Sequence, residues 1–420
     1  MLPHHAALLS FEGPDRYASV GGLGTRVTAL ADALADAGVD AQLFFIGDPA
    51  LPPVEERRDG FTLRRWAQWI SAFHPANVYA GEAAKVDDYT ASIPPFVVDE
   101  IVVPAAARGE RVLIIAEEWQ TARAAIALDW LLRARGLRDV VTLMWNANNT
   151  YGFERIDWEA LRDAATITTV SKYMKFELAQ TGVSALVIPN GIPPELLAGA
   201  DPTRTAAVRK ALSGQPLLVK VGRFDPDKNW LQAIDAAAEL RSNGYDLQFV
   251  LRGNSSPYGS TVLSHARARG LRVVDVEYAG SDVAELAREL ASAKGDVLNL
   301  RAFLDEATLY ALYAAADAVL ANSGKEPFGL VGLEVMAAGG IAVCGATGEE
   351  YAEPFVNALV CDTGDGRELA GYLRVLVDDA TIASRLRTNG RATAERYAWP
   401  NVLETLSRKI DYVEATAGFR

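Results

Sequence analysis

The sequence predicts an α/β protein of two doubly wound domains, each a mainly parallel sheet covered by helices, which face each other across a cleft. Three observations support this prediction: a length of 420 residues, a hydrophobic share of 50%, and short apolar runs that alternate with amphipathic stretches. The length exceeds what one hydrophobic core normally supports, so two domains of about 200 residues each are expected. The alternation is typical of helices laid over a parallel sheet.

Apolar runs flanked by Gly, Pro or Asn predict strands throughout the chain. In the first half they fall at 6–10, 41–46, 112–116, 141–145, 167–170 and 186–188. In the second half they fall at 217–221, 247–251, 296–300, 318–321, 341–344 and 359–361. Helices alternate with them, for example 231–243, which ends at Gly244.

The break between the domains is placed in PNGIPPELLAGADP, 189–202, where Pro and Gly residues interrupt any regular element. We therefore expect a first domain at 1–195, a second at 196–398, and a C-terminal helix at 399–420 that packs back on the first domain. Doubly wound sheets bind ligands outside the carboxyl ends of their strands, so a ligand site is expected in the cleft.

Charge and composition exclude several classes of protein. A net charge of −13 argues against nucleic-acid binding, which needs a basic surface. Cys344 and Cys361 lie in predicted strands and are expected to be buried, reduced thiols, as in a cytosolic protein. The start, MLPHHAALLSFEG, has no basic region, and nowhere do 18 apolar residues run together. We therefore expect a cytoplasmic chain without export or stable membrane insertion.

The Gly-rich segment SVGGLGTR, 19–26, is the first candidate for phosphate binding. It follows the first predicted strand and opens a helix. Gly21, Gly22 and Gly24 leave the backbone accessible, so that N–H groups and the positive end of the helix would face a diphosphate. The alternative is a tight turn without a ligand, because the spacing is not the G-x-G-x-x-G of dinucleotide-binding proteins.

The segment VGRFDPDKNW, 221–230, is the second candidate. A strand ending at Gly222 delivers Arg223 and Lys228 to the mouth of the second sheet, and two fixed cations suit a departing diphosphate. Asp225 is interpreted as the cap of a helix that begins with Pro226. An Asp-x-Asp metal site with Asp227 would need further oxygen ligands, so we expect no metal.

The segment NSGKEPFGLVGLEVMAAGG, 322–340, is the most specific of the three. Pro327 and Gly329 keep Glu326 in a loop, whereas 330–338 has a helical apolar pattern that places Glu334 in the early turns. A carboxylate at such a helix start can accept hydrogen bonds from two vicinal hydroxyls, as in sugars and riboses. For Glu334 alone, the alternative is stabilisation by the helix dipole.

Together with VIPNGI at 187–192 and FLDEATLYALYAAADAVLANS at 303–323, these motifs resemble the retaining glycosyltransferases related to glycogen synthase and sucrose synthase, the family 4-like group. Those enzymes have the two-Rossmann architecture called GT-B, and the resemblance spans most of the chain. It implies that Glu326 binds hydroxyls of the donor sugar and that Glu334 binds the donor ribose. It also implies that Arg223 and Lys228 bind the diphosphate.

Further donor contacts follow from the same resemblance. The implied contacts are the backbone of Phe328, Gly329 and Leu330, Gly22 at the phosphate, and Arg252, Gly253, Phe303 and Leu304 at the base.

The sequence departs from the family at one position near the reacting sugar. Relatives carry a histidine there, whereas this chain has WNANNTYGF, 145–153, so Asn146 or Asn148 takes its place. An asparagine can form hydrogen bonds to the sugar, but it cannot act as a base near neutral pH.

Two segments of the first domain are candidates for the acceptor. AEEWQTA, 116–122, places Glu118 at a strand end, where it would orient an acceptor hydroxyl; the alternative is an exposed glutamate that opens a helix. In RRWAQWISAFHPANVYAG, 64–81, Trp66, Trp69 and Phe73 have helical spacing and are interpreted as core in preference to a stacking surface for sugars.

The expected function is metal-independent transfer of a hexosyl group, with glucose favoured, from a nucleotide diphosphate sugar to a hydroxyl of a sugar, sugar phosphate or glucan. UDP-glucose is favoured over ADP- or GDP-sugars, and no other cofactor is expected. The residues expected at the chemistry are Glu326, Arg223, Lys228, Asn146 and Glu118. A GT-B sugar-nucleotide epimerase and a non-catalytic sugar- or nucleotide-binding regulator are the alternatives, and a homodimer is left open.

Overall fold

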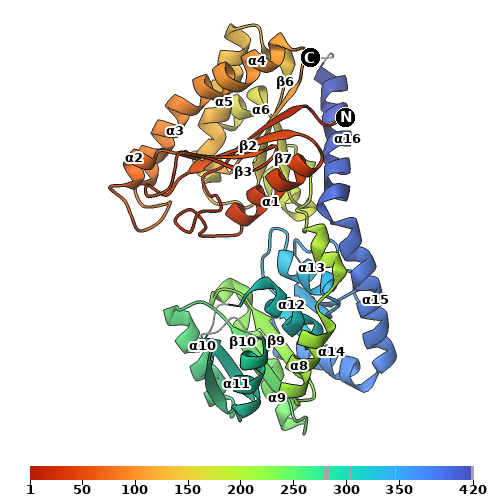
Figure 1. The fold of residues 1–420 in the computed structure, drawn as a ribbon. Helices are drawn as coiled ribbons and strands as arrows, with labels where there is room; N and C mark the ends of the chain where they lie inside the picture. The colour runs from red at the N-terminus through yellow and green to blue at the C-terminus, as the bar shows by residue number, and fades with distance from the viewer. Residues whose placement is uncertain (279–282, 302–303, 346, 418–420) are drawn as a thin grey trace. The chain divides into compact units, whose positions relative to one another are not determined.

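The computed structural model describes residues 1–278, 283–301, 304–345 and 347–417 (Figure 1). The chain forms two compact units, Met1–Gly191 with Trp399–Arg420, and Ile192–Ala398. The boundary between them lies inside the predicted segment 189–202, four residues before the expected position. The last helix, α16 (Trp399–Ala417), belongs to the first unit.

An eight-stranded sheet forms the centre of the first unit, in the order β3-β4-β2-β1-β5-β6-β7-β8. All neighbours are parallel except β3 and β4, which are antiparallel. Its strands are β1 (His5–Leu9), β2 (Asp40–Ile46), β3 (Val54–Arg58), β4 (Phe61–Trp66), β5 (Val112–Glu117), β6 (Val141–Ala147), β7 (Thr166–Thr169) and β8 (Leu186–Val187).

Helices follow most of these strands and bury the central ones, so that β5 and β6 are buried over their whole length. The helices of the first unit besides α16 are α1 (Leu23–Asp36), α2 (Gln68–Ser71), α3 (Glu82–Val97), α4 (Val103–Ala107), α5 (Trp119–Ala134), α6 (Trp158–Ala164) and α7 (Lys172–Ala179). Short helical turns are the π-helical η1 (Val98–Val102) and the 3-10 turns η2 (Arg138–Val140) and η3 (Phe153–Arg155).

A seven-stranded, all-parallel sheet forms the centre of the second unit, in the order β11-β12-β10-β9-β13-β14-β15. Its strands are β9 (Leu217–Val221), β10 (Gln248–Arg252), β11 (Val273–Glu277), β12 (Val297–Arg301), β13 (Ala318–Ala321), β14 (Ala342–Gly345) and β15 (Leu359–Cys361). Its helices are α8 (Pro202–Ala211), α9 (Trp230–Ser242), α10 (Pro257–Ala268), α11 (Val283–Ser292), α12 (Glu306–Ala315), α13 (Leu330–Ala337), α14 (Gly366–Asp378) and α15 (Ala380–Arg396), with 3-10 turns η4 (Pro194–Ala198) and η5 (Pro226–Lys228).

Every strand predicted from the apolar runs is present, displaced by no more than two residues at either end. Cys344 and Cys361 are buried on strands and are not joined to each other. Three strands were not predicted: the hairpin pair β3 and β4, and β11. β3 and β11 are edge strands and β4 is the neighbour of β3, and none of the three is a continuous apolar run.

One helical run in the part of the chain described, Glu82–Ala107, is long and apolar enough to cross a membrane by length and composition alone. A buried helix of a folded domain passes the same test. Tyr89, Ile93 and Val97 on this run are fully buried, and the Tyr89 hydroxyl donates a hydrogen bond to the Phe44 carbonyl at 3.0 Å. These contacts show that the run packs within the first unit.

Candidate functional site

Strand order in the second unit changes direction between β9 and β13. From β9 the chain moves to one edge of the sheet, and it returns on the other side of β9 to form β13. Ligands of doubly wound proteins bind outside the carboxyl ends of the strands at such a point. The segments that follow these two strands contain Arg223 and Lys228 in one case and Glu326 in the other, so two of the predicted motifs meet here.

Lys228 Nζ donates a hydrogen bond to Glu326 Oε2, and the two side chains form an ion pair. They are 25% and 21% exposed, so the pair lies at the edge of the unit and not in its core. Arg223 is exposed, and within the described ranges no acceptor or carboxylate pairs with its guanidinium. One predicted cation is thus neutralised by the chain itself, while the charge of the other is available.

The backbone that carries both cations is fixed by local polar groups. Asp225 accepts a hydrogen bond from the N–H of Asp227 at 3.0 Å and caps η5, which confirms the capping interpretation. Trp230 Nε1 donates to the Arg223 carbonyl at 2.8 Å. The turn is therefore held in place while the Arg223 side chain faces outward.

Helix α13 begins immediately behind Glu326. Its N-cap, Gly329, has a φ of 75°, and no side chain caps the helix. Phe328 is only 4% exposed, and its ring packs near those of Tyr351 and Tyr397. Phe328 can therefore face a ligand only through its backbone, which is the role expected for it.

Glu334 lies on the second turn of α13 and is partly buried. Burial, and then the charge of Glu306, raises the pKa of Glu334 to about 7. Burial, and then the charge of Glu334, raises the pKa of Tyr310 and Tyr313, whereas Arg252 opposes the rise at Tyr313. Glu334 and Arg252, both expected at the nucleoside, therefore lie around the same tyrosine.

The remaining segments expected at the base lie near this edge. Arg252 ends β10, beside the end of β9. At Gly253 a Cβ atom would lie 2.4 Å from the Phe224 ring, so only glycine fits. Leu304 is buried, and Phe303 lies outside the described residues.

In the first unit the strand order changes direction between β1 and β5, and the Gly-rich turn follows β1. Glu12 Oε2 accepts hydrogen bonds from the N–H groups of Gly21 at 3.0 Å and Gly24 at 3.2 Å. The Tyr79 hydroxyl donates to Glu12 Oε1 at 2.5 Å. The turn binds an anion, but that anion is a carboxylate of the chain. Gly22 differs from Gly21 and Gly24 in that the space beside it is open, since a Cβ atom there would have no atom within 4 Å.

A buried polar network joins α1, β5 and the segment that leaves β8. Arg26 forms an ion pair with Glu117, and both side chains are at most 5% exposed. Arg26 Nε also donates a hydrogen bond to Asn190 Oδ1. Arg26, which ends the Gly-rich segment, therefore holds the fold of this unit together and does not face outward.

The same network decides between Asn146 and Asn148. Asn146 Nδ2 donates to Glu117 at 2.9 Å, its Oδ1 accepts from Thr168 at 2.9 Å, and the residue is 1% exposed. Both ends of the Asn146 amide are thus engaged, so the role expected for it at the sugar does not fit its position. Asn148 is partly exposed, and its Oδ1 has no partner among the described residues.

Glu118 has an unusual backbone conformation. Its φ of 67° and ψ of 170° fall in a region that is essentially restricted to glycine. The Trp145 indole donates to its carbonyl at 2.9 Å, and Glu118 Oε1 accepts from the Asn148 N–H at 2.7 Å. Burial raises the Glu118 pKa to about 8. The group is therefore mainly protonated at neutral pH, and strain of this kind is typical of functional sites.

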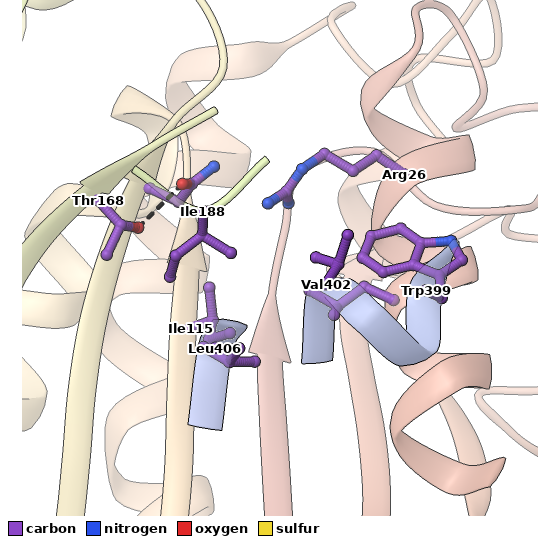
Figure 2. Close-up of a pocket in the computed structure, with 9 residues that line it drawn as sticks. Arg26, Ile115, Thr168, Ile188, Trp399, Val402 and Leu406 are labelled. Atoms are coloured by element: carbon purple, nitrogen blue, oxygen red, sulfur yellow. Dashed lines mark hydrogen bonds between the residues drawn. The ribbon is translucent and has the colours of Figure 1, made fainter. Parts of the chain in front are cut away.

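A small cavity lies between the sheet of the first unit and α16 (Figure 2). Arg26, Asn146 and Thr168 line its polar side, and Trp399, Val402 and Leu406 of α16 contribute to its apolar side. It has room for no more than about one water molecule. This cavity is therefore a packing space and not a substrate site.

The aromatic stretch at 64–81 differs from its interpretation as helical core. Trp66 lies on strand β4 and packs against Phe96. Trp69 is 65% and Phe73 78% exposed, so the core interpretation is wrong for these two. The helical spacing misled because α2 is only one turn long and 64–66 are extended.

Two charged residues near the edge of the second sheet were missed. Lys220 is 2% exposed, donates to Asn322 Oδ1 at 2.6 Å, and has a pKa lowered by burial to about 7. A lysine inside the apolar run LLVKV is a visible signal for such a buried cation. Glu349 follows β14 and is 6% exposed, and nothing in the sequence distinguishes it from the other glutamates nearby.

Known proteins resemble this chain in sequence and in fold. Residues 203–393 match the family model "Glycosyl transferases group 1". The chain is 29% identical over 249 residues to 2-deoxystreptamine glucosyltransferase of Streptomyces kanamyceticus, covering 57% of this chain and 58% of that one. It is 27% identical over 266 residues to alpha-maltose-1-phosphate synthase of Mycobacterium tuberculosis, covering 59% and 63%. The matches thus span about three-fifths of these relatives.

Solved structures resemble the chain over nearly its whole length. Sucrose-phosphate synthase from Thermosynechococcus elongatus matches with a TM-score of 0.68 at 21% identity, covering 98% of this chain and 100% of that one. The catalytic domain of starch synthase IV from Arabidopsis thaliana matches with a TM-score of 0.70 at 16% identity, covering 98% and 99%. Together these comparisons show that the chain has the GT-B fold and that its second unit resembles the group 1 glycosyltransferases.

Proposed function

We propose that the protein is a glycosyltransferase that moves a hexosyl group, with glucose favoured, from a nucleotide diphosphate sugar to a hydroxyl acceptor with retention of anomeric configuration. The observation that carries the proposal is the pairing of Lys228 with Glu326 at the point where the strand order changes direction. This point lies in the unit that matches the family model. A cation for the diphosphate and a carboxylate for sugar hydroxyls are adjacent there, as a nucleotide sugar requires.

Donor binding would exchange the partner of Lys228, with the diphosphate replacing Glu326. Negative charge builds on the diphosphate as the bond between the anomeric carbon and the phosphate oxygen breaks, so Lys228 and Arg223 would stabilise the transition state. Glu326, released from Lys228, would accept hydrogen bonds from the sugar hydroxyls. The acceptor oxygen would bond to the anomeric carbon from the same face, and its proton would pass to the departing diphosphate.

The first unit would hold the acceptor, with Glu118 and Asn148 as its hydrogen-bonding groups. Glu118 is mainly protonated at neutral pH because burial raises its pKa to about 8, so it would donate to an acceptor oxygen and would not remove its proton. The acceptor class proposed is a sugar, sugar phosphate or glucan. UDP-glucose is the favoured donor, the reaction needs no metal or further cofactor, and the enzyme acts in the cytoplasm.

The test is thermal unfolding of the protein with UDP-glucose, ADP-glucose or GDP-mannose, each with and without EDTA. A ligand that binds only the folded state raises Tm, and we expect one donor to do so equally in both conditions. Proton NMR of that donor with candidate acceptors should then show an α-linked product. Failure of every nucleotide sugar to raise Tm would contradict the proposal. Conversion of the donor without an acceptor would favour a sugar-nucleotide epimerase. Binding of the donor without any turnover would favour a non-catalytic regulator.

A further inference from the structure

Two loops at the carboxyl edge of the second sheet interlock through a reciprocal pair of glycines. A Cβ atom at Gly348 would lie 1.6 Å from the carbonyl oxygen of Glu326, and one at Gly329 would lie 2.4 Å from Cγ of Glu349. Each glycine therefore admits the glutamate of the other loop. Thr347 Oγ1 accepts from the Glu326 N–H at 3.2 Å and joins the loops further. Glu349 is thus held beside the Glu326 loop by packing.

Glu349 is a buried carboxyl group that its own surroundings satisfy only in part. The residue is 6% exposed, and Oε2 has no hydrogen-bond partner in the part of the chain that the structure describes. Burial, and then the charge of Glu326, raises the pKa of Glu349 well above its ordinary value, while a backbone hydrogen bond from Gly345, and then the charges of Lys228 and Lys220, oppose the rise. A buried polar atom without a partner costs stability. A ligand group that bonds Oε2 would remove that cost.

The groups around Glu349 indicate whether the diphosphate or the sugar of a bound nucleotide sugar would be its partner. A diphosphate is a poor partner for a carboxyl group, because its charge is negative and Arg223 and Lys228 already offer it cations. A sugar hydroxyl is neutral and both donates and accepts, so it can bond to Glu349 in either protonation state. The neighbouring glutamate, Glu326, is the one proposed to hold sugar hydroxyls.

We propose that Glu349 is a second sugar-binding carboxyl group of the donor site, which hydrogen-bonds a hydroxyl of the transferred hexosyl group and selects among donor sugars. This inference rests on the proposed function, but it concerns the sugar alone and not the nucleotide. A sugar that lacks the hydroxyl, or presents it in the other orientation, leaves a buried carboxyl group unpaired. A site that hydrogen-bonds a substrate hydroxyl discriminates between substrates more strongly than a site that selects them by size alone.

The test compares Glu349→Leu and Glu349→Gln with the wild type by calorimetric titration of UDP and of UDP-glucose. Glu349→Leu should weaken UDP-glucose binding about tenfold or more and leave the Kd of UDP within about twofold. Glu349→Gln keeps the shape and hydrogen-bonding capacity of the side chain, so it should retain most of the UDP-glucose affinity. Glu353, which is exposed in the same segment, provides the matched control Glu353→Leu, expected to bind both ligands as the wild type does.

Several outcomes would overturn the inference. Equal loss of UDP and UDP-glucose binding in Glu349→Leu would indicate a structural role, and stronger UDP binding in Glu349→Gln would indicate that Glu349 opposes the phosphate. Unchanged UDP-glucose binding in Glu349→Leu would exclude contact with the sugar. If the wild type itself binds no nucleoside diphosphate or nucleotide sugar, the proposed function fails, which is a different result from a failure confined to the variants.

A donor panel covers the case in which Glu349→Leu does not fold. Glu349→Asp keeps the carboxyl group but withdraws it by one methylene from the sugar, so at a Tm near that of the wild type it should change the ratio of kcat/KM for UDP-glucose to that for UDP-galactose or UDP-xylose by about fivefold or more. A ratio equal to that of the wild type for both competing donors would overturn the assignment.

Discussion

Lys228 and Glu326 lie 98 positions apart in the sequence and form a hydrogen-bonded ion pair at the carboxyl edge of the second sheet. Because both side chains are partly exposed, such a pair contributes at most about 1 kcal/mol to stability. Exchanging one partner for a ligand therefore costs little. The ion pair also holds a cation and a carboxylate side by side, where the diphosphate and the sugar of one donor would need them.

Removing either cation of this edge should slow transfer strongly. Arg223→Ala and Lys228→Ala each remove positive charge from the proposed diphosphate site, where negative charge would build during transfer, so we expect kcat to fall by about a hundredfold or more. Steady-state kinetics with saturating donor measures this. Lys210→Ala removes an exposed lysine from α8 and should leave kcat unchanged. Normal turnover in both Arg223→Ala and Lys228→Ala would remove the diphosphate assignment.

The two glutamates of the Glu-x7-Glu motif should separate catalysis from nucleotide binding. Glu326→Ala should lower kcat more than it weakens binding of the nucleoside diphosphate, because Glu326 is assigned to the sugar. Glu334→Ala should mainly weaken nucleoside diphosphate binding, because Glu334 is assigned to the ribose. Calorimetric titration of each variant, combined with turnover rates, tests the division, and equal losses of nucleotide affinity would count against it.

Glu334 should also make nucleotide affinity depend on pH. Its pKa is about 7, and only the deprotonated carboxylate can accept hydrogen bonds from both ribose hydroxyls. The Kd for the nucleoside diphosphate should therefore fall as pH rises from 6 to 8, with proton release on binding. Glu334→Gln should flatten that dependence in the same titrations. A wild-type Kd that does not change over this range would argue against a ribose contact through Glu334.

The sequence was most informative where strands are buried on both sides. Central strands such as β5 (Val112–Glu117) are continuous apolar runs, which is what burial between helices requires. The missed hairpin β3–β4 lies at the edge, where VEERR is mostly exposed and has no such run. The Asp59–Gly60 turn between these strands was a usable hairpin signal.

The site was predictable only in so far as strand ends determine it. Arg223 and Lys228 follow β9, and Glu326 follows β13. Because the carboxyl ends of parallel strands lie at the same edge of a sheet, the sequence alone predicts that these residues lie at one edge. Glu12 and Glu349 depend instead on how loops pack against glycines, and no pattern along the chain records that packing. Asn146 and Asn148 are two residues apart and both donate to Glu117, so only the hydrogen bond from Thr168 to the Asn146 amide oxygen shows which one is engaged at both ends.

The Gly-rich turn offers a matched pair of substitutions. A Cβ atom at Gly24 would lie 2.6 Å from the carbonyl oxygen of Gly13, whereas one at Gly22 would meet no atom within 4 Å. Gly24→Ala should therefore lower the free energy of unfolding by about 1–3 kcal/mol, and Gly22→Ala should leave it nearly unchanged. Urea unfolding at constant m-value measures both. If Gly22 approaches the donor phosphate, Gly22→Ala should weaken nucleotide binding despite its normal stability, and unchanged binding would remove Gly22 from the site.

Glu118 should make the stability of the protein depend on pH in a way that one substitution removes. Its pKa is raised from 4.5 to about 8 in the folded chain, so the folded state holds a proton that the unfolded state loses between these values. The resulting contribution to stability is complete below pH 4.5 and is lost as pH rises toward 8. Glu118→Gln does not titrate and can still accept the hydrogen bond from the Asn148 N–H. The Tm of Glu118→Gln, relative to the wild type, should therefore increase by about 4 °C or more between pH 5 and pH 8.

The comparison needs a control that changes charge without changing a buried group. Glu159 is exposed on α6 of the same unit, so Glu159→Gln should follow the wild type at every pH, and differential scanning calorimetry from pH 5 to pH 8 measures all three proteins. Other buried acids, such as Glu334, titrate equally in each of them and cancel in the difference. A constant difference in Tm between Glu118→Gln and the wild type would mean that Glu118 is already ionised near neutral pH. In that case it would meet the acceptor as a charged hydrogen-bond acceptor and not as a donor.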